Sequence, residues 1–297
     1  MSTTGTIHDL GYKRYAGPRS SPATRWIVIM RNQISTGWKT WWRFKASLGL
    51  AVLTTFIAGG VMFILKDKVV RDFGGSFAAT MADAALPKSI EWYTRAAFLV
   101  SLTIGARVVA GDLQSGAFTF YFARSVRPRD YVAGKLAGMV GLVAPIMLAG
   151  PLALALARLG LSENVDQLVA TLPLIPKAIA IGLLGTLVFA TVPLAFSSLV
   201  PNARYAIALW AAYYLVFGVM VSLLGRTSHS WIGALDLATA LDAIAMKLFD
   251  LQLFKGRAGW VPADAALASV LIHAAAAIAI LSWNVRRAYG SGVGGAS

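Results

Sequence analysis

The sequence lacks the residues on which most enzymatic and metal chemistry depends. It contains no cysteine, so disulfides and thiol chemistry are excluded. Its three histidines form no His-Glu-x-x-His motif, and no acidic pair lies inside an apolar run, so we expect neither a metal nor catalytic residues. A Gly-x-x-x-x-Gly-Lys-Ser/Thr motif is also missing, and the chain is therefore not expected to hydrolyse ATP by itself.

Charged residues are scarce, and apolar residues dominate. Charged residues make up 13% of the chain and hydrophobic residues 57%, which lies outside the range of soluble domains. Six apolar runs are long enough to cross about 30 Å of hydrocarbon as helices, and they are continuous rather than alternating. The sequence thus predicts an all-α integral membrane protein with six transmembrane helices. The predicted spans cover about residues 46–65, 90–110, 136–157, 178–200, 205–225 and 265–285.

Acidic residues are few, which leaves a formal net charge of +14. If the N-terminus is cytoplasmic, the inner side holds 16 of the 27 Lys and Arg residues but only three of the 13 acids. The positive-inside rule therefore predicts a multi-pass protein with both termini in the cytoplasm. Because orientation accounts for the excess charge, no basic patch is left to indicate nucleic-acid binding.

Residues 1–45 are predicted to form a cytoplasmic tail and an amphipathic helix. At about 100° per residue, apolar and basic side chains of the segment 22–44 fall on opposite faces. Tryptophan on one face and Arg or Lys on the other are typical of a helix lying in the headgroup plane, although an ordinary start to the first span is the alternative. The residues that define this interfacial helix are Trp26, Trp38, Trp41, Arg25, Lys39 and Arg43.

Residues 46–285 form the predicted six-helix domain, and 286–297 form a second cytoplasmic tail. The outer connection 226–264 repeats apolar residues at helical spacing, so we expect one or two short helices that re-enter toward the membrane and pack there. Away from the outer ends of the spans, ionisable residues are limited to Arg107 and Lys135 near inner ends and His273, which argues against an ion-driven transporter. His273 is expected to hydrogen-bond across helices rather than to carry protons.

The 25-residue connection 111–135, between the second and third spans, combines aromatic residues with cations. Three Phe and one Tyr lie between Phe118 and Phe122, and four cations follow through Lys135. This composition is too apolar for a solvated turn and too charged for a membrane span. We therefore expect a short cytoplasmic helix that docks on another surface.

The connection resembles the one found at the same place in the permeases of type-2 ABC exporters. Both have an acid four residues before a glycine, an apolar stretch, an arginine, a basic turn and a Tyr-x-x-Gly-Lys that opens the third span. The chain departs from the family pattern in three ways, namely Ala117 for Thr, Ser125 for Pro, and a shifted pair Pro128-Arg129. The matching positions are Asp112, Gly116, Phe118, Phe120, Tyr121, Phe122, Arg124, Val126, Tyr131, Gly134 and Lys135.

The resemblance extends over nearly the whole chain and implies a permease whose connection 111–135 is a coupling helix seated on a cytosolic ABC ATPase. It further implies that the ATPase subunits bind ATP and Mg, that a second permease copy or a homologous permease completes the pathway, and that membrane lipids surround it. Aromatic rings would fill a pocket of the ATPase, and Asp112 would cap the helix. The residues assigned to ATPase coupling are Asp112, Gly116, Phe118, Phe120, Tyr121, Arg124, Arg127 and Arg129.

Other interpretations of the same residues stay open. The arginines could meet acids of the ATPase or lipid phosphates, or could only mark the inner face. A non-transporting ABC membrane subunit, which relays ATPase motion to a larger envelope machine, is the main alternative function. A channel or secondary carrier, working without an ATPase, is another. Spans rich in Ala, Leu, Val and Gly leave the substrate unknown.

Overall fold

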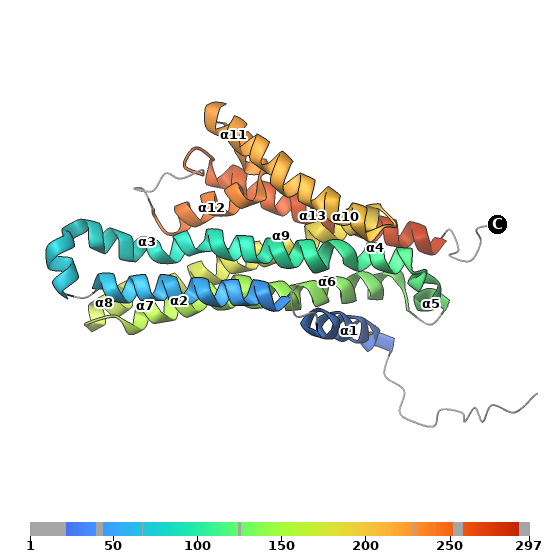
Figure 1. The fold of residues 1–297 in the computed structure, drawn as a ribbon, viewed down its shortest axis with the longest axis horizontal. Helices are drawn as coiled ribbons and strands as arrows, with labels where there is room; N and C mark the ends of the chain where they lie inside the picture. The colour runs from blue at the N-terminus through green and yellow to red at the C-terminus, as the bar shows by residue number, and fades with distance from the viewer. Residues whose placement is uncertain are drawn as a thin grey trace, which may run out of the picture.

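The computed structural model describes residues 22–39, 44–66, 68–123, 126–228, 230–251 and 258–290, and these parts of the chain are helical without any strand. Six helical segments are long and apolar enough to cross a membrane, and they run along one long axis (Figure 1). The prediction of an all-helical, multi-pass membrane protein is therefore confirmed. The six spans are Ala46–Lys66, Thr80–Gln114, Pro128–Gly160, Val165–Leu199, Ala203–Ser228 and Ala263–Gly290.

Four of the six spans consist of more than one element: π-helical turns interrupt three of them, and a short break separates two α-helices in the fourth. These turns are η3 (Ser101–Gly105), η4 (Pro145–Ala149) and η5 (Ala212–Phe217). The α-helices are α1 (Arg25–Lys39), α2 (Ala46–Lys66), α3 (Lys68–Val100), α4 (Ala106–Gln114), α5 (Ala117–Ala123), α6 (Pro128–Ala144), α7 (Gly150–Gly160), α8 (Val165–Thr171), α9 (Leu174–Leu199), α10 (Ala203–Ala211), α11 (Gly218–Ser228), α12 (Leu237–Leu248) and α13 (Ala263–Gly290). Two 3₁₀ turns, η1 (Pro22–Thr24) and η6 (Trp231–Leu235), precede α1 and α12.

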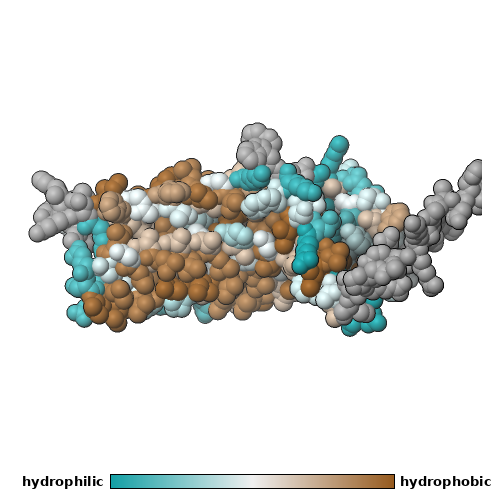
Figure 2. Space-filling view, turned by 90° about the horizontal axis from the view of Figure 1, so that it is seen from below, coloured by the Kyte–Doolittle hydropathy of each residue, from teal (hydrophilic) through white to brown (hydrophobic). Residues whose placement is uncertain are grey.

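The outer surface is apolar along most of the long axis. Figure 2 shows a broad hydrophobic band, with hydrophilic atoms gathered toward the two ends of the molecule. Exposed side chains of α2 contribute to the apolar surface, among them Phe56, Ile57 and Phe63. Exposed apolar side chains are unfavourable in water but suit a hydrocarbon solvent. The long axis is therefore the direction in which the bundle crosses a membrane.

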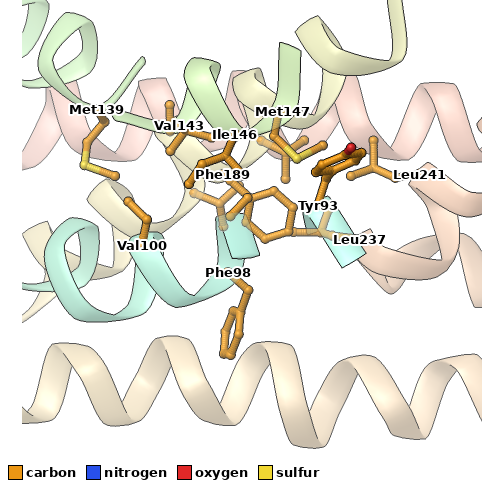
Figure 3. Packing of buried hydrophobic residues seen from close by; sticks show 14 of the residues in the cluster. Tyr93, Phe98, Val100, Met139, Val143, Ile146, Met147, Phe189, Leu237 and Leu241 are labelled. Atoms are coloured by element: carbon orange, nitrogen blue, oxygen red, sulfur yellow. The ribbon is translucent and has the colours of Figure 1, made fainter. Parts of the chain in front are cut away.

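The core lies where α3, η4 and α9 of the second, third and fourth spans meet. Tyr93, Ile146, Met147 and Phe189 point toward one another from three spans (Figure 3). Phe98 points away from them toward the fifth span, where its ring stacks on that of Tyr214 at 4.0 Å. The ring of Tyr93 lies directly against the backbone of Gly150. This is possible because Gly150 has no side chain. Close packing of this kind fixes how the spans sit against each other.

α12 forms part of this packing rather than an exposed loop. Its first turn is capped by Asp236, whose carboxylate accepts hydrogen bonds from the backbone N–H groups of Ala238 and Thr239 at 3.3 and 3.2 Å. Most of its residues are buried, and it contacts α3, α9 and α13. A helix thus lies within 226–264 and packs on the spans, whereas its re-entry toward the membrane from the outer side stays a prediction.

One end of the bundle carries α1, α5 and the last turns of α13, and we call it the α5 end (Figure 1). The predicted coupling residues that the structure describes lie there, on α4, α5, α6 and the turns between them. Their geometry decides what this end can do.

Candidate functional site

A glycine sets the turn between α4 and α5. Gly116 has a φ of +68°, which residues with a side chain rarely adopt. The N–H of Gly116 donates to the carbonyl of Leu113 at 3.3 Å, and that of Ser115 donates to Gly111 at 3.0 Å. These bonds close the end of α4 and allow α5 to start in a new direction. The backbone conformation of this turn therefore explains why the predicted pattern has a glycine at position 116.

An ion pair joins α4 to α6. Lys135 Nζ lies 2.6 Å from Asp112 Oδ2, and the Tyr131 hydroxyl donates to the same oxygen at 2.7 Å. The side chains of Lys135 and Asp112 are only 7% and 19% exposed, so water screens the pair weakly. The ammonium also lies 5.3 Å from the centre of the Tyr131 ring. These three residues form one polar unit, the Asp112 cluster.

The expectation that Asp112 caps the coupling helix is wrong. α4 continues to Gln114, so Asp112 lies inside that helix, whereas α5 begins at Ala117. The carboxylate is engaged by Lys135 instead, because a nearly buried ammonium needs a counter-charge. Asp112 thus holds two spans together at the base of α5. Its assignment to ATPase coupling stays a prediction.

The aromatic residues of α5 divide into buried and exposed side chains. Phe118 is 1% exposed, and its ring meets the rings of Tyr131 and Phe122 edge-on, at 5.0 and 5.3 Å between centres. Tyr121 also contacts Tyr131 edge-on, at 5.5 Å. Phe120, by contrast, is 73% exposed. Phe118 therefore fills the chain's own core rather than a partner's pocket, and Phe120 is the ring that α5 presents outward.

A further ring contact fixes α5 to α13, and the surroundings of Tyr121 keep its phenol protonated. Phe122 meets Tyr289 of α13 edge-on at 5.1 Å between ring centres. Burial raises the pKa of Tyr121, and the carboxylate of Asp112 raises that pKa further. The phenol therefore keeps its proton at neutral pH and remains a hydrogen-bond donor. With contacts to α6 and α13, α5 is attached to the ends of the third and sixth spans.

The basic turn after α5 starts α6. Pro128 occupies the first helical position, where its missing N–H costs nothing, and Asp130 accepts a hydrogen bond from the N–H of Arg127 at 3.2 Å. The shifted Pro128-Arg129 pair is thus a helix start. Arg127 and Arg129 are exposed, and the latter makes only a long ion pair with Asp130 at 4.0 Å. Arg124 lies outside the described residues.

α1 packs on α6 through a row of glycines. A side chain at any of the three would collide with α1, with nearest distances of 2.7 to 2.8 Å from an added Cβ. Small residues spaced in this way let two helices approach closely in a membrane. The row consists of Gly134 against Ile29, Gly138 against Gln33 and Gly141 against Ile34. Gly134 of the Tyr-x-x-Gly-Lys pattern is therefore the contact between α1 and the third span.

Replacing Gly134 with alanine is expected to lower the free energy of unfolding by about 1–3 kcal/mol. The new Cβ would lie 2.7 Å from Ile29 Cβ and 2.8 Å from the backbone oxygen of Trp26, so α1 would have to move away. Thermal unfolding of the purified protein in detergent measures the loss. Gly49→Ala in α2 is the control, since an added Cβ there meets nothing within 4 Å. Equal losses in both variants would contradict the close packing.

The residues predicted to define an interfacial helix have different surroundings. Trp38 and Lys39 are exposed, whereas Trp26 and Arg25 are half-buried. Trp41 and Arg43 lie outside the described residues. Gly37, on the predicted apolar face, is buried against Leu142 and Ile104. Part of the apolar face of α1 thus packs on the protein itself, and the rest is exposed on the surface of the bundle.

His273 hydrogen-bonds across helices, as expected. Its Nε2 lies 2.6 Å from the hydroxyl of Tyr213, and its Nδ1 lies 2.7 Å from the carbonyl oxygen of Ser269. A carbonyl can only accept, so Nδ1 carries a proton, and in a neutral ring Nε2 then accepts from the Tyr213 hydroxyl. This arrangement ties η5 to α13. Both ring nitrogens are occupied by structural bonds.

Two polar contacts that the sequence did not indicate connect α4 and η3 to other spans. Ser197 Oγ of α9 accepts hydrogen bonds from the N–H groups of Val109 and Ala110 at 3.0 and 2.9 Å. Ser101 Oγ accepts from the indole N–H of Trp210 at 3.0 Å. A single serine inside an apolar run is too common to mark such a contact. The second span is thereby bonded to the fourth and fifth.

Comparison with known proteins adds no family. A scan against protein-family models and a search of curated proteins both find no match for this chain. Among the described residues, no group of three or more His, Asp or Glu side chains could hold a metal ion. The resemblance to ABC permeases thus remains an inference from the chain's own residues.

Proposed function

We propose that the protein is the transmembrane permease subunit of an ATP-driven ABC exporter. The observation that supports this most directly is α5, a short helix between the second and third spans that presents Phe120 outward. An exposed ring on a rigid base is the kind of side chain that anchors an interface. The chain has no nucleotide-binding motif, so partner ATPase subunits would bind ATP and Mg.

The charge distribution supports a cytoplasmic location for the α5 end. Arg127, Arg129, Arg204 and Arg287 all belong to elements that begin or end there. In a bacterial inner membrane such an excess of cations marks the cytoplasmic side, where an ATPase would meet α5. Both termini would then lie in the cytoplasm.

Force applied to α5 would reach several spans. Phe118 and Tyr121 contact Tyr131 at the start of α6, and the Asp112 cluster ties α6 to α4. From α4 the hydrogen bonds to Ser197 lead into the fourth span. Closure of two ATPase subunits would therefore move the second, third and fourth spans together. Packed side chains transmit such movement because they do not compress.

A second permease copy, or a homologous permease, would complete the transport pathway. The fifth span is the least buried of the six, so it has the most surface to offer lipid or another subunit. The non-transporting alternative would need an outer surface for a large envelope partner. α12 offers little, since most of its residues are buried in the bundle. This favours the transporting function.

Replacing Phe120 with glutamate is expected to reduce association with the ATPase at least 10-fold while leaving the fold intact. A hot-spot ring contributes about 2 kcal/mol or more to an interface, which corresponds to a factor of about 30. The permease would be co-expressed with ABC ATPase subunits of the same genome, and the co-purified amount and its ATPase activity would be measured. The side chain is mostly exposed, so the unfolding midpoint should not change.

Tyr205→Glu is the matched control. Tyr205 is an exposed ring near the start of α10, at the same end of the bundle but on another element. It should keep full association. If Phe120→Glu also retains the ATPase, α5 is not the docking helix and the proposed function loses its support.

A further inference from the structure

A cavity of about 280 Å³ lies at the α5 end, between α4, the end of α9 and the last turns of α13 (Figure 1). Eight of the eleven residues that line it are apolar, so its walls offer few hydrogen bonds. Phe118 of α5 forms one wall, and the buried side chains of Val109 and Val285 form others. Leu199 and Pro201 also line the cavity and are exposed. The ends of the second, fourth and sixth spans therefore surround an apolar space that opens to the surface of the bundle.

The three polar residues of the lining differ in what they bind. Asn284 Nδ2 donates to Ser198 Oγ at 3.1 Å, and Ser198 Oγ donates to the carbonyl of Ala195 at 2.8 Å. Arg287 is exposed, and within the described part of the chain its guanidinium makes neither an ion pair nor a hydrogen bond. None of the described residues that line the cavity is acidic. Arg287 thus places one uncompensated positive charge at the opening, with five N–H donors available.

An apolar cavity with one cation at its opening matches a ligand that joins an apolar chain to an anionic head. Water inside the cavity would find few polar partners, whereas a hydrocarbon chain gains by leaving water. The planar fork of Arg287 suits two oxygens of one phosphate group. The volume lies just below the range of about 300–1,000 Å³ that holds drug-sized ligands. Only the part of the ligand next to its head would therefore be enclosed, and the rest of the chain would lie along the outside of the bundle.

Exposed aromatic residues near the cavity place it at headgroup depth. Trp283 directly precedes Asn284 on α13, and Tyr205 lies near the start of α10, four residues after Pro201. Trp and Tyr are enriched where membrane and water meet. Basic pockets between spans bind the headgroups of anionic lipids at this depth. A free anion from the aqueous side would leave the apolar walls to water, so the position and the lining together favour a lipid.

We propose that this cavity binds an anionic phospholipid of the leaflet at the α5 end. The Arg287 guanidinium holds the phosphate, and the apolar walls hold the start of one acyl chain. The lipid contacts α4, α9 and α13 together, so it ties the ends of three spans to one another beside α5. The inference goes beyond the proposed function, because it requires a membrane around the chain but neither an ATPase nor transport.

The test is thermal unfolding of the purified full-length protein in detergent with three additives. These are phosphatidylglycerol, phosphatidylcholine with the same acyl chains, and inorganic phosphate at constant ionic strength. Phosphatidylglycerol near saturation is expected to raise the unfolding midpoint by about 5 °C, because a ligand that binds only the folded state stabilises it. Phosphatidylcholine should raise it by less than half as much, since its headgroup has no net charge for Arg287 to attract. Inorganic phosphate, which has no chain, should not shift it.

Three variants assign the shift to the cavity. Arg287→Gln should remove most of the difference between the two lipids and leave the midpoint without lipid unchanged, because the side chain is exposed. Arg286→Gln is the matched control: it removes an exposed cation next to Arg287 that does not line the cavity, and it should keep the full difference. Ala288→Leu adds apolar atoms to the lining without changing the charge. It should therefore reduce the shift with phosphatidylglycerol by filling part of the space.

Several results would overturn the proposal. Equal shifts with both lipids, or none with phosphatidylglycerol, would show that the charge of Arg287 recognises no headgroup. A shift of the same size with inorganic phosphate would identify a free ion as the ligand. Equal losses in Arg287→Gln and Arg286→Gln would mean general attraction to an anionic surface. A shift that persists in Arg287→Gln and Ala288→Leu, while both variants lose ATPase association, would mean that a partner's side chain occupies the cavity.

Discussion

Asparagine in place of Asp112 is expected to lower the free energy of unfolding by about 3–5 kcal/mol, because it leaves a buried charge without its partner. The Lys135 side chain is only 7% exposed and its ammonium lies 2.6 Å from the Asp112 carboxylate. Asparagine is similar in shape and can still accept from the Tyr131 hydroxyl, so shape and hydrogen bonding change little. The loss of unfolding free energy therefore measures the cost of leaving the Lys135 charge without a partner. Unfolding of the purified protein in detergent, by heat or denaturant, measures it.

Two companion variants separate the pair from its members. Lys135→Met should cost less than Asp112→Asn, because Asp112 is more exposed and water can solvate it. The double variant should recover most of the loss, since replacing both members of a buried pair removes the unpaired charge. A double variant as unstable as Asp112→Asn would show that the cluster is held by something other than this pair.

The six spans could be predicted from apolar runs alone, but their ends could not. The sequence predicts a second span that begins near residue 90, whereas the candidate span in the structure begins at Thr80 and α3 itself at Lys68. Charged residues in 80–95 made this stretch resemble a loop. They are accommodated on the helix, where Asp83 pairs with Arg158 at 2.5 Å and Glu91 pairs with Arg95 at 3.4 Å. Hydropathy identifies the apolar part of a helix, which lies in the hydrocarbon. The helix itself can continue past both ends of that part.

The candidate site was predicted as a set of positions but not as a set of contacts. The spacing from Asp112 to Lys135 marked the right segment, yet the partner of Asp112 follows only from how the chain folds back at Gly116. The burial of Gln33 likewise follows only from the fold, because it depends on Gly138 of α6, more than 100 positions along the sequence. The amphipathic pattern of one helix shows which of its faces is buried. It does not show which other helix packs there, because that depends on how the two surfaces fit.

The sequence also does not determine which face of α5 packs against the rest of the protein. Apolar rings occupy nearly every position from Phe118 to Phe122, so no polar face shows which side meets the protein. The face of α5 that packs inward is determined by Tyr131 on α6, whose ring contacts that of Phe118 edge-on. Phe118 and Phe120 were therefore expected to act alike. The structure assigns them opposite surroundings, one core and one surface.

Replacing Phe118 with alanine is expected to lower the free energy of unfolding by about 3–5 kcal/mol, the cost of removing a large ring from a packed core. The ring is 1% exposed and contacts Tyr131 and Phe122 edge-on, so its loss opens a cavity beside the Asp112 cluster. Phe118→Leu, which keeps most of the volume, should lose much less. Phe120→Ala removes the same number of atoms from a side chain that is 73% exposed and should change stability by no more than about 0.5 kcal/mol.

The comparison of these two alanine variants separates folding from docking. Phe118→Ala should weaken ATPase association only in proportion to the unfolded fraction, so lowering the temperature or adding a stabilising lipid should restore it. Phe120→Ala should weaken association at every temperature without changing the unfolding midpoint. If Phe118→Ala were as stable as the parent and yet failed to bind the ATPase, its ring would have to leave the core on docking. α5 would then be a helix that rearranges rather than a rigid base, and force on it would not pass directly to α6.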